Sequence, residues 1–130
     1  MARFTSGMLL AVVGATSLLA GCTSGDAQCA APTVTVEPER VVAGGTVVVS
    51  GEGFLAACHD QGEGPSPVST GLPLTLAPDT EGAETVSFGT FDAAADASVR
   101  ASVTVPAETP PGPATLSLGR ASVDIEVAAP

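Results

Sequence analysis

Hydrophobic and polar residues alternate with a period of two along much of the chain after residue 32. The clearest runs are residues 99–105, 114–118 and 121–127, in which Val, Leu, Ile and Ala alternate with Ser, Thr and charged residues. Such alternation is typical of antiparallel strands that have one buried face and one face in water. Gly119-Arg120 joins the last two runs and suits a tight two-residue hairpin.

The same period predicts shorter strands earlier in the chain. Val34 and Val36 alternate with threonines up to Pro38, which is expected to end that strand, and residues 46–50 form a β-branched run. The Gly-Glu-Gly sequence at residues 51–53 is expected to break this second run. Leu72, Leu74 and Leu76 share one face of a further strand, and its Pro73 favours a sheet edge, because proline cannot donate to the hydrogen-bond ladder.

These elements predict an all-β fold. We expect about seven strands, spaced roughly 8–15 residues apart, which indicates a single small immunoglobulin-like antiparallel β-sandwich over residues 33–127. No stretch after residue 22 has a convincing helical period. The residues expected inside the sandwich are Val99, Val103, Leu116, Leu118, Val123 and Ile125.

Residues 1–21 have the layout of a secretory signal. A positive side chain at Arg3 precedes an almost wholly apolar stretch over residues 8–20, which is too short for a comfortable transmembrane helix. The sequence Leu19-Ala20-Gly21-Cys22 resembles the lipobox of bacterial lipoproteins. The resemblance implies a signal helix cleaved before Cys22 and a diacylglycerol on its sulfur; the alternative is an ordinary signal with a chance cysteine.

A lipid on Cys22 predicts a protein held on the extracytoplasmic face of the cell membrane. Residues 22–32, which are mostly small and polar, are expected to form the lipidated tether. After loss of residues 1–21, three arginines stand against all 14 acidic residues, a net charge of −11. A surface of that sign gives no basic patch for nucleic acid and no basic help in binding a membrane.

The remaining two cysteines, Cys29 and Cys58, form an even pair in an oxidising compartment, so we expect a disulfide between them. Closing a loop of about 30 residues stabilises a fold by roughly 3–4 kcal/mol on the chain-entropy model. The bridge would support a domain that holds only three phenylalanines, Phe54, Phe88 and Phe91.

With the motifs Val34-Thr-Val-Glu-Pro38, Gly53-Phe54 and Val105-Pro106, two segments of the chain resemble bacterial immunoglobulin-like domains of the IPT/TIG type. The first begins Val34-Thr-Val-Glu-Pro38 and runs through the Gly44-Gly45 turn and the valine run to Gly53-Phe54. The second is Val105-Pro106 followed by Pro-Pro-Gly112 and two alternating strands. The resemblance covers about residues 33–127 and implies a β-sandwich that serves as a spacer or binding module. The chain lacks the Trp and Tyr of antibody-type domains.

Catalytic chemistry has few candidates in this chain. Its one histidine, His59, follows Cys58 in a Gly- and Pro-rich segment, and a nucleophilic Cys-His couple would need Cys58 outside the disulfide. We therefore expect no enzyme activity, no cofactor and no transition-metal site. A calcium site on Asp60 and Glu63, or on Asp79 and Glu81, is a weaker alternative, since no EF-hand spacing is present.

Two classes of function remain open. One is a non-enzymatic binding or structural module of the cell envelope, with a possible envelope protein as partner. The other is a small ligand- or metal-binding lipoprotein. The candidate contact surface is the loop of residues 56–71, because it carries His59, Asp60 and Glu63 and because loops on rigid scaffolds often carry function; the alternative is a long, tolerant loop.

Overall fold

The computed structural model of the protein describes residues 30–59 and 64–130. The described residues form eight strands and no helix, which confirms the all-β prediction. The predicted signal helix lies outside the described residues. The strands are β1 (Thr33–Glu37), β2 (Arg40–Val42), β3 (Thr46–Glu52), β4 (Leu72–Pro78), β5 (Val86–Phe91), β6 (Val99–Thr104), β7 (Gly112–Leu118) and β8 (Ala121–Ala128).

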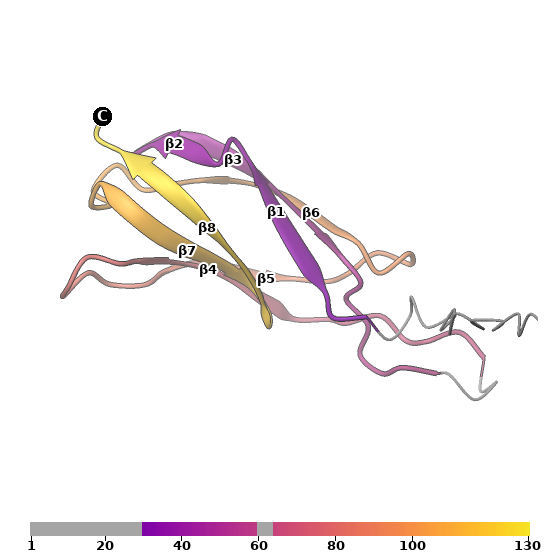
Figure 1. Ribbon diagram of the computed structural model, residues 1–130. Coiled ribbons are helices and arrows are strands. Elements are labelled where there is room, and N and C mark those ends of the chain that lie inside the picture. The colour runs from indigo at the N-terminus through magenta and orange to yellow at the C-terminus, as the bar shows by residue number, and fades with distance from the viewer. Residues whose placement is uncertain (1–29, 60–63) are drawn as a thin grey trace, which may run out of the picture.

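The strands form two sheets that face each other as the layers of a sandwich (Figure 1). One sheet has three strands in the order β1-β3-β6, and the other has five in the order β2-β8-β7-β4-β5. Two layers with alternating inward residues are the architecture of an immunoglobulin-like sandwich. The predicted fold class is therefore confirmed.

The first stretch of chain contributes to both sheets. β1 pairs with β3, after which the chain crosses to the other layer, and β2 pairs with β8 in parallel, with Arg40 opposite Glu126. Two backbone hydrogen bonds hold this crossing, from Glu126 to the Glu39 carbonyl at 2.9 Å and from Ala43 to the Ala128 carbonyl at 3.0 Å. The prediction of purely antiparallel pairing is wrong at β2, because a three-residue strand is too short to show a period.

The hairpin at the end of the chain matches the prediction closely. Leu118 pairs with Ala121 across the Gly119-Arg120 link, and the register continues to Gly112 opposite Val127. Gly119 has a φ of 56°, in the left-handed region that the first central position of a type II′ turn requires. This glycine allows β7 and β8 to form the longest uninterrupted pairing in the larger sheet.

The core consists of aliphatic side chains that the alternating strands direct between the layers. The largest fully buried side chains are Leu74, Leu76, Leu116, Leu118, Val47, Val49, Val105 and Val127. Burial of each such side chain contributes about 1.5–3 kcal/mol relative to exposure. Of the six core residues predicted, five are buried: Val99, Val103, Leu116, Leu118 and Ile125.

The sixth residue is Val123, which is less buried than predicted. Its side chain is only partly buried and packs against the edge of the core cluster. Val123 lies opposite Leu116 of β7, whereas Ala121, Ile125 and Val127 on the same strand are buried. Alternation identifies the inward face of a strand, but it does not show how far the opposing sheet extends over that face.

Pro73 does not mark an edge strand. β4 lies inside the five-stranded sheet, between β7 and β5. The ladder accommodates the proline because pairing with β7 begins only at Leu74 and because the β4–β5 register shifts between Pro73 and Thr75. Pro73 therefore occupies a position beside a bulge, one of the few sheet positions that tolerate a residue with no N–H.

The sequence predicts that the strand breaks at Gly51, but β3 continues through this residue. The strand continues to Glu52, and Gly51 is buried and paired with Val34 on one side and Val99 on the other. A Cβ at this position would collide with the ring of Phe54 and would lie 3.1 Å from the Leu118 side chain. The glycine is required by the close approach of Phe54, which is 2% exposed and fills the core at this end.

Different segments of the chain lie at the two ends of the sandwich. The end at which residues 30–32 enter the sandwich is called the tether end here, and the opposite end is called the distal end. At the tether end, Thr33 pairs with Glu52, and Phe54 packs near Gly119 of the β7–β8 turn. At the distal end, Gly44 donates to the Val105 carbonyl at 2.8 Å and Ala43 donates to the C-terminal strand. Figure 1 shows β1 beginning at one end of the layers and the C-terminus lying at the other. A seven-residue strand places these ends roughly 20–25 Å apart.

The difference between Val127 and Val123 provides a matched test of the core. Val127→Ala should lower the free energy of unfolding by about 2 kcal/mol, because it removes two fully buried methyl groups and leaves a cavity. Val123→Ala, on the same strand, should cost less than about 1 kcal/mol. Chemical denaturation of both variants measures the difference, and equal losses would contradict the placement of the core.

Candidate functional site

The predicted contact loop, residues 56–71, is closed at its base by backbone hydrogen bonds. Ala56 donates to the Pro67 carbonyl at 2.8 Å and Ser69 donates to the Phe54 carbonyl at 2.9 Å, and Leu55 forms an isolated bridge with Val68. The segment therefore leaves and re-enters the sandwich at a fixed point. The sequence showed no pattern here, because these pairs are too few to produce alternation.

The residues predicted for this loop are only partly within the structure. His59 is half-buried, its backbone N–H donates to Ser66 Oγ at 2.9 Å, and its Nδ1 has no hydrogen-bond partner among residues 30–59 and 64–130. Asp60 and Glu63 lie outside the described residues, as do Cys22 and Cys29. Their grouping with His59 and the Cys29–Cys58 bridge therefore stay predictions.

This loop lies at the tether end of the molecule. A shallow cavity of about 270 Å³ is lined there by residues from both the loop and the start of the described chain, including Ala30, Gly53, Cys58 and Arg120. The predicted contact loop is thus a neighbour of the segment that leads toward Cys22.

Asp96, also at the tether end, orders the loop that leads into β6. Ser98 donates to Asp96 Oδ1 from its hydroxyl at 2.6 Å and from its backbone N–H at 3.1 Å. The side-chain hydrogen bond from Ser98, with the backbone bond, holds the pKa of the exposed Asp96 carboxyl below its usual range. This carboxylate serves the local backbone conformation.

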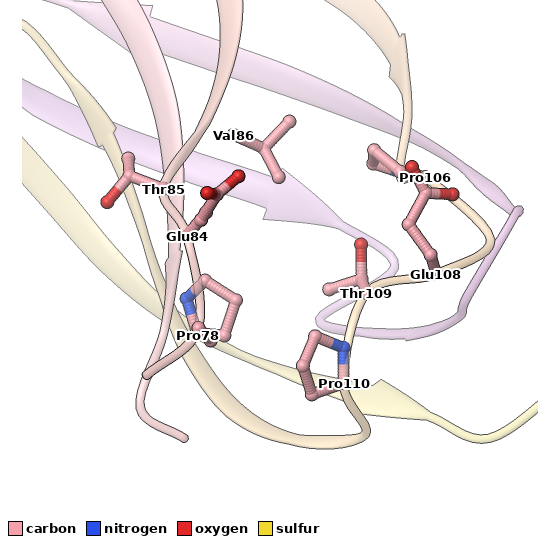
Figure 2. A pocket seen from close by; sticks show the side chains of 9 residues that line it. Pro78, Glu84, Thr85, Val86, Pro106, Glu108, Thr109 and Pro110 are labelled. Carbon is pink, nitrogen blue, oxygen red and sulfur yellow. The ribbon is translucent and has the colours of Figure 1, made fainter. Parts of the chain in front are cut away.

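The larger cavity opens at the distal end, where sequence analysis placed no site. It has a volume of about 400 Å³ and lies between the β4–β5 turn and the segment that joins β6 to β7. Figure 2 shows the side chains that surround it. The lining residues are Pro78, Ala83, Glu84, Thr85, Val86, Pro106, Glu108, Thr109 and Pro110.

Backbone hydrogen bonds hold both walls of this distal pocket. One wall is fixed by the bond from Ala83 to the Thr80 carbonyl at 3.1 Å and by the bond from Asp79 to the Pro113 carbonyl at 3.0 Å. In the other wall, Thr109 donates to the Pro106 carbonyl at 3.0 Å, and Val105 exchanges bonds with the Gly44-Gly45 turn. The two walls are therefore parts of the sandwich, with little freedom to separate.

Thr109 is the one polar residue among residues 30–59 and 64–130 that is buried, at 5% exposure. Its hydroxyl has no hydrogen-bond partner in this described part of the chain, and Figure 2 shows the oxygen directed into the space that the lining residues enclose. The β-branched side chain is stiff, and Pro110 restricts the backbone of Thr109 to extended conformations. The hydroxyl is therefore held in place without a partner.

Two carboxylates flank the same space. Glu84 and Glu108 come from opposite walls, and both side chains are exposed. Figure 2 shows their carboxylates on either side of the Thr109 hydroxyl. Neither forms an ion pair within the described ranges. The rest of the lining is three proline rings with Ala83, Thr85 and Val86, so the pocket combines a mostly apolar wall with negative charge and one buried hydroxyl.

The residues considered for a metal site can also be located in the structure. Asp79 and Glu81, considered for calcium, are exposed in the β4–β5 turn. Within residues 30–59 and 64–130 there is no group of three or more His, Cys, Asp or Glu residues arranged to hold a metal ion. The distal pocket gives no signal in the sequence, because its lining comes from two segments far apart in the chain, around the β4–β5 turn and before β7.

The sequence matches no protein-family model, and no curated protein is significantly similar to it. In the part of the chain that the structure describes, no helix has the length and apolar character needed to cross a membrane.

The unpartnered hydroxyl of Thr109 leads to a test by stability. A buried polar group without a partner costs about 1–3 kcal/mol, so the isosteric change Thr109→Val should leave the free energy of unfolding unchanged or raise it by up to about 1 kcal/mol. Thr85→Val, on the exposed rim, should change it by less than about 0.5 kcal/mol. Thermal and chemical unfolding measure both variants. A clear loss of stability in Thr109→Val would show that the hydroxyl is satisfied.

Proposed function

We propose that the protein is a lipid-anchored, non-enzymatic binding module on the extracytoplasmic face of the cell membrane, built on an IPT/TIG-type sandwich. One observation carries the proposal. The segment leading from Cys22 joins the sandwich at one end, and a preformed pocket opens at the other. An anchor at one end and a binding surface at the opposite end suit a domain that is displayed to partners in the envelope.

The rigidity of the scaffold supports binding as the activity. The distal pocket is framed by backbone hydrogen bonds to the Gly44-Gly45 turn and to Pro113, so a ligand would meet backbone walls that are already in place. Preorganisation lowers the entropic cost of association. The proposal moves the main contact surface from the loop of residues 56–71 to the distal end, which a membrane anchor would leave open.

The second candidate is a small-ligand-binding lipoprotein. The observation that favours it is the size and lining of the distal pocket, about 400 Å³ with the buried hydroxyl of Thr109. Small-molecule sites span about 300–1,000 Å³, with a few polar groups in an apolar wall. This candidate shares the anchor and the display geometry with the first, and it differs only in what occupies the pocket.

Lipidation is tested by replacement of the acceptor. Cys22→Ala should abolish lipid attachment, because no other residue of the motif carries a sulfur, and it should leave the chain uncleaved or released from the membrane. Fractionation of cells and mass measurement of the mature chain detect both effects. Cys29→Ser is the matched control, since it removes a cysteine outside the motif and should leave the protein on the membrane. Normal processing and full membrane retention of Cys22→Ala would refute the anchor.

The Cys29–Cys58 disulfide is tested on the native protein. Its mass before reduction should be about 2 Da below that of the reduced chain, one pair of hydrogens for one bridge. Reduction should also lower the free energy of unfolding, by roughly 3–4 kcal/mol on the chain-entropy model. Two thiols that react with an alkylating reagent in the unreduced native protein would rule the bridge out.

A further inference from the structure

We propose that the distal pocket binds an organic cation, namely an ammonium or guanidinium group carried on an aliphatic stem. This inference rests on the proposed binding function and names the ligand class of the same site. Its two possible sources are a lysine or arginine side chain of a protein partner and a free aliphatic amine.

The buried hydroxyl of Thr109 is the first observation behind this proposal. Buried polar groups are nearly always hydrogen-bonded, so one without a partner needs an explanation. A ligand N–H that donates to this oxygen would satisfy it, and hydrogen bonds that involve a charged donor are about twice as strong as neutral ones. Because Thr109 is 5% exposed, the ligand reaches the oxygen only if side chains at the rim move aside. Glu84 and Glu108 are exposed and can rotate.

The negative charge at the rim of the pocket favours a positively charged ligand. Glu84 and Glu108 flank the pocket from opposite walls, and neither is paired with a cation within the described ranges. A positive group between them would gain two favourable interactions, whereas an anion would meet two repulsive ones. The net charge of the whole chain, −10, attracts cations to the surface and so favours the encounter.

The proline rings in the walls of the pocket favour a ligand with an aliphatic stem. The rings of Pro78, Pro106 and Pro110, with Val86, give the pocket an apolar surface that can cover methylene groups. Long cationic side chains bury their stems against such surfaces while the charged end stays near polar groups. A metal ion fits the lining less well, because calcium takes 6–8 oxygen ligands and the described residues hold no three-residue acidic cluster.

The test is a titration of the purified full-length chain in detergent micelles, followed by the backbone amide NMR signals of Thr109 and Val86. The probes are n-pentylamine, its neutral analogue n-pentanol, and the blocked tripeptide acetyl-Gly-Lys-Gly-amide. The proposal predicts saturable shifts with n-pentylamine or with the tripeptide, and affinity that falls as salt is raised. Absence of saturable shifts with both cations, or equal affinity for n-pentanol, would overturn it.

Variants separate the contributions of the hydroxyl and of the carboxylates. Thr109→Val should weaken binding of the cation about tenfold, as expected for loss of a hydrogen bond to a charged group. The double change Glu84→Gln with Glu108→Gln should weaken it about fivefold or more. Glu81→Gln, in the same turn but outside the lining, is the control and should bind as the original chain does. Unchanged affinity in both the Thr109 and the double variant would refute the site.

The two probes also identify the source of the cation. Tighter binding of the tripeptide than of n-pentylamine indicates a protein side chain, and the reverse indicates a free amine; either result supports the proposed ligand class. The titration does not depend on a lipid anchor. If the chain binds the cation but the Cys22 fractionation shows no anchor, the ligand class stands and the proposed location is wrong. If the chain is anchored through Cys22 but binds no cation, the proposed location stands and the ligand class is wrong.

Discussion

The face-to-face packing of two aliphatic sheet surfaces holds every other feature of the molecule in place. Val47 and Val49 of β3 belong to the same core cluster as Leu74 and Leu116 of the other sheet, and all four are fully buried. The buried aliphatic side chains are short, so the core is filled by many small contributions and the layers have to stay in register along their whole length. Because side chains in a strand alternate, a slip of one residue in any strand would turn its buried set toward water. The two ends of the sandwich are therefore held in fixed positions.

This packing explains why the two ends differ. At the tether end, Phe54 closes the core over Gly51 and fills the space between the sheets. At the distal end the corresponding position is taken by the β4–β5 turn and the proline-rich segment before β7, whose rings line a cavity around the Thr109 hydroxyl. Proline and the residue before it have restricted backbones, so this segment has little conformational freedom. A rigid end with an unsatisfied polar group is the kind of local conflict that is expected at functional sites.

The alternation in the last third of the chain was enough to predict β6, β7, β8 and the hairpin at Gly119, since each of these strands has a covered and an uncovered face. The sequence was less informative where tertiary contacts override local pattern. Gly51 resembled a strand breaker, and only the approach of Phe54 explains it. Pro73 suggested an edge, but a register shift accommodates it inside the sheet. The distal pocket could not be predicted, because Thr109 lies in a segment that predicts only a turn and the opposite wall, with Pro78 and Val86, comes from a strand pair distant in the sequence.

The central claim is that an anchor at one end leaves the distal pocket facing away from the membrane. Energy transfer from a dye on the domain to acceptor lipids in reconstituted vesicles measures this directly. The dye is attached at Ala107 of the distal end or at Arg120 of the tether end, each through a single added cysteine at an exposed position. The account predicts strong transfer from position 120 and much weaker transfer from position 107, since the two ends lie roughly 20–25 Å apart. Equal transfer from both positions, or stronger transfer from position 107, would contradict it.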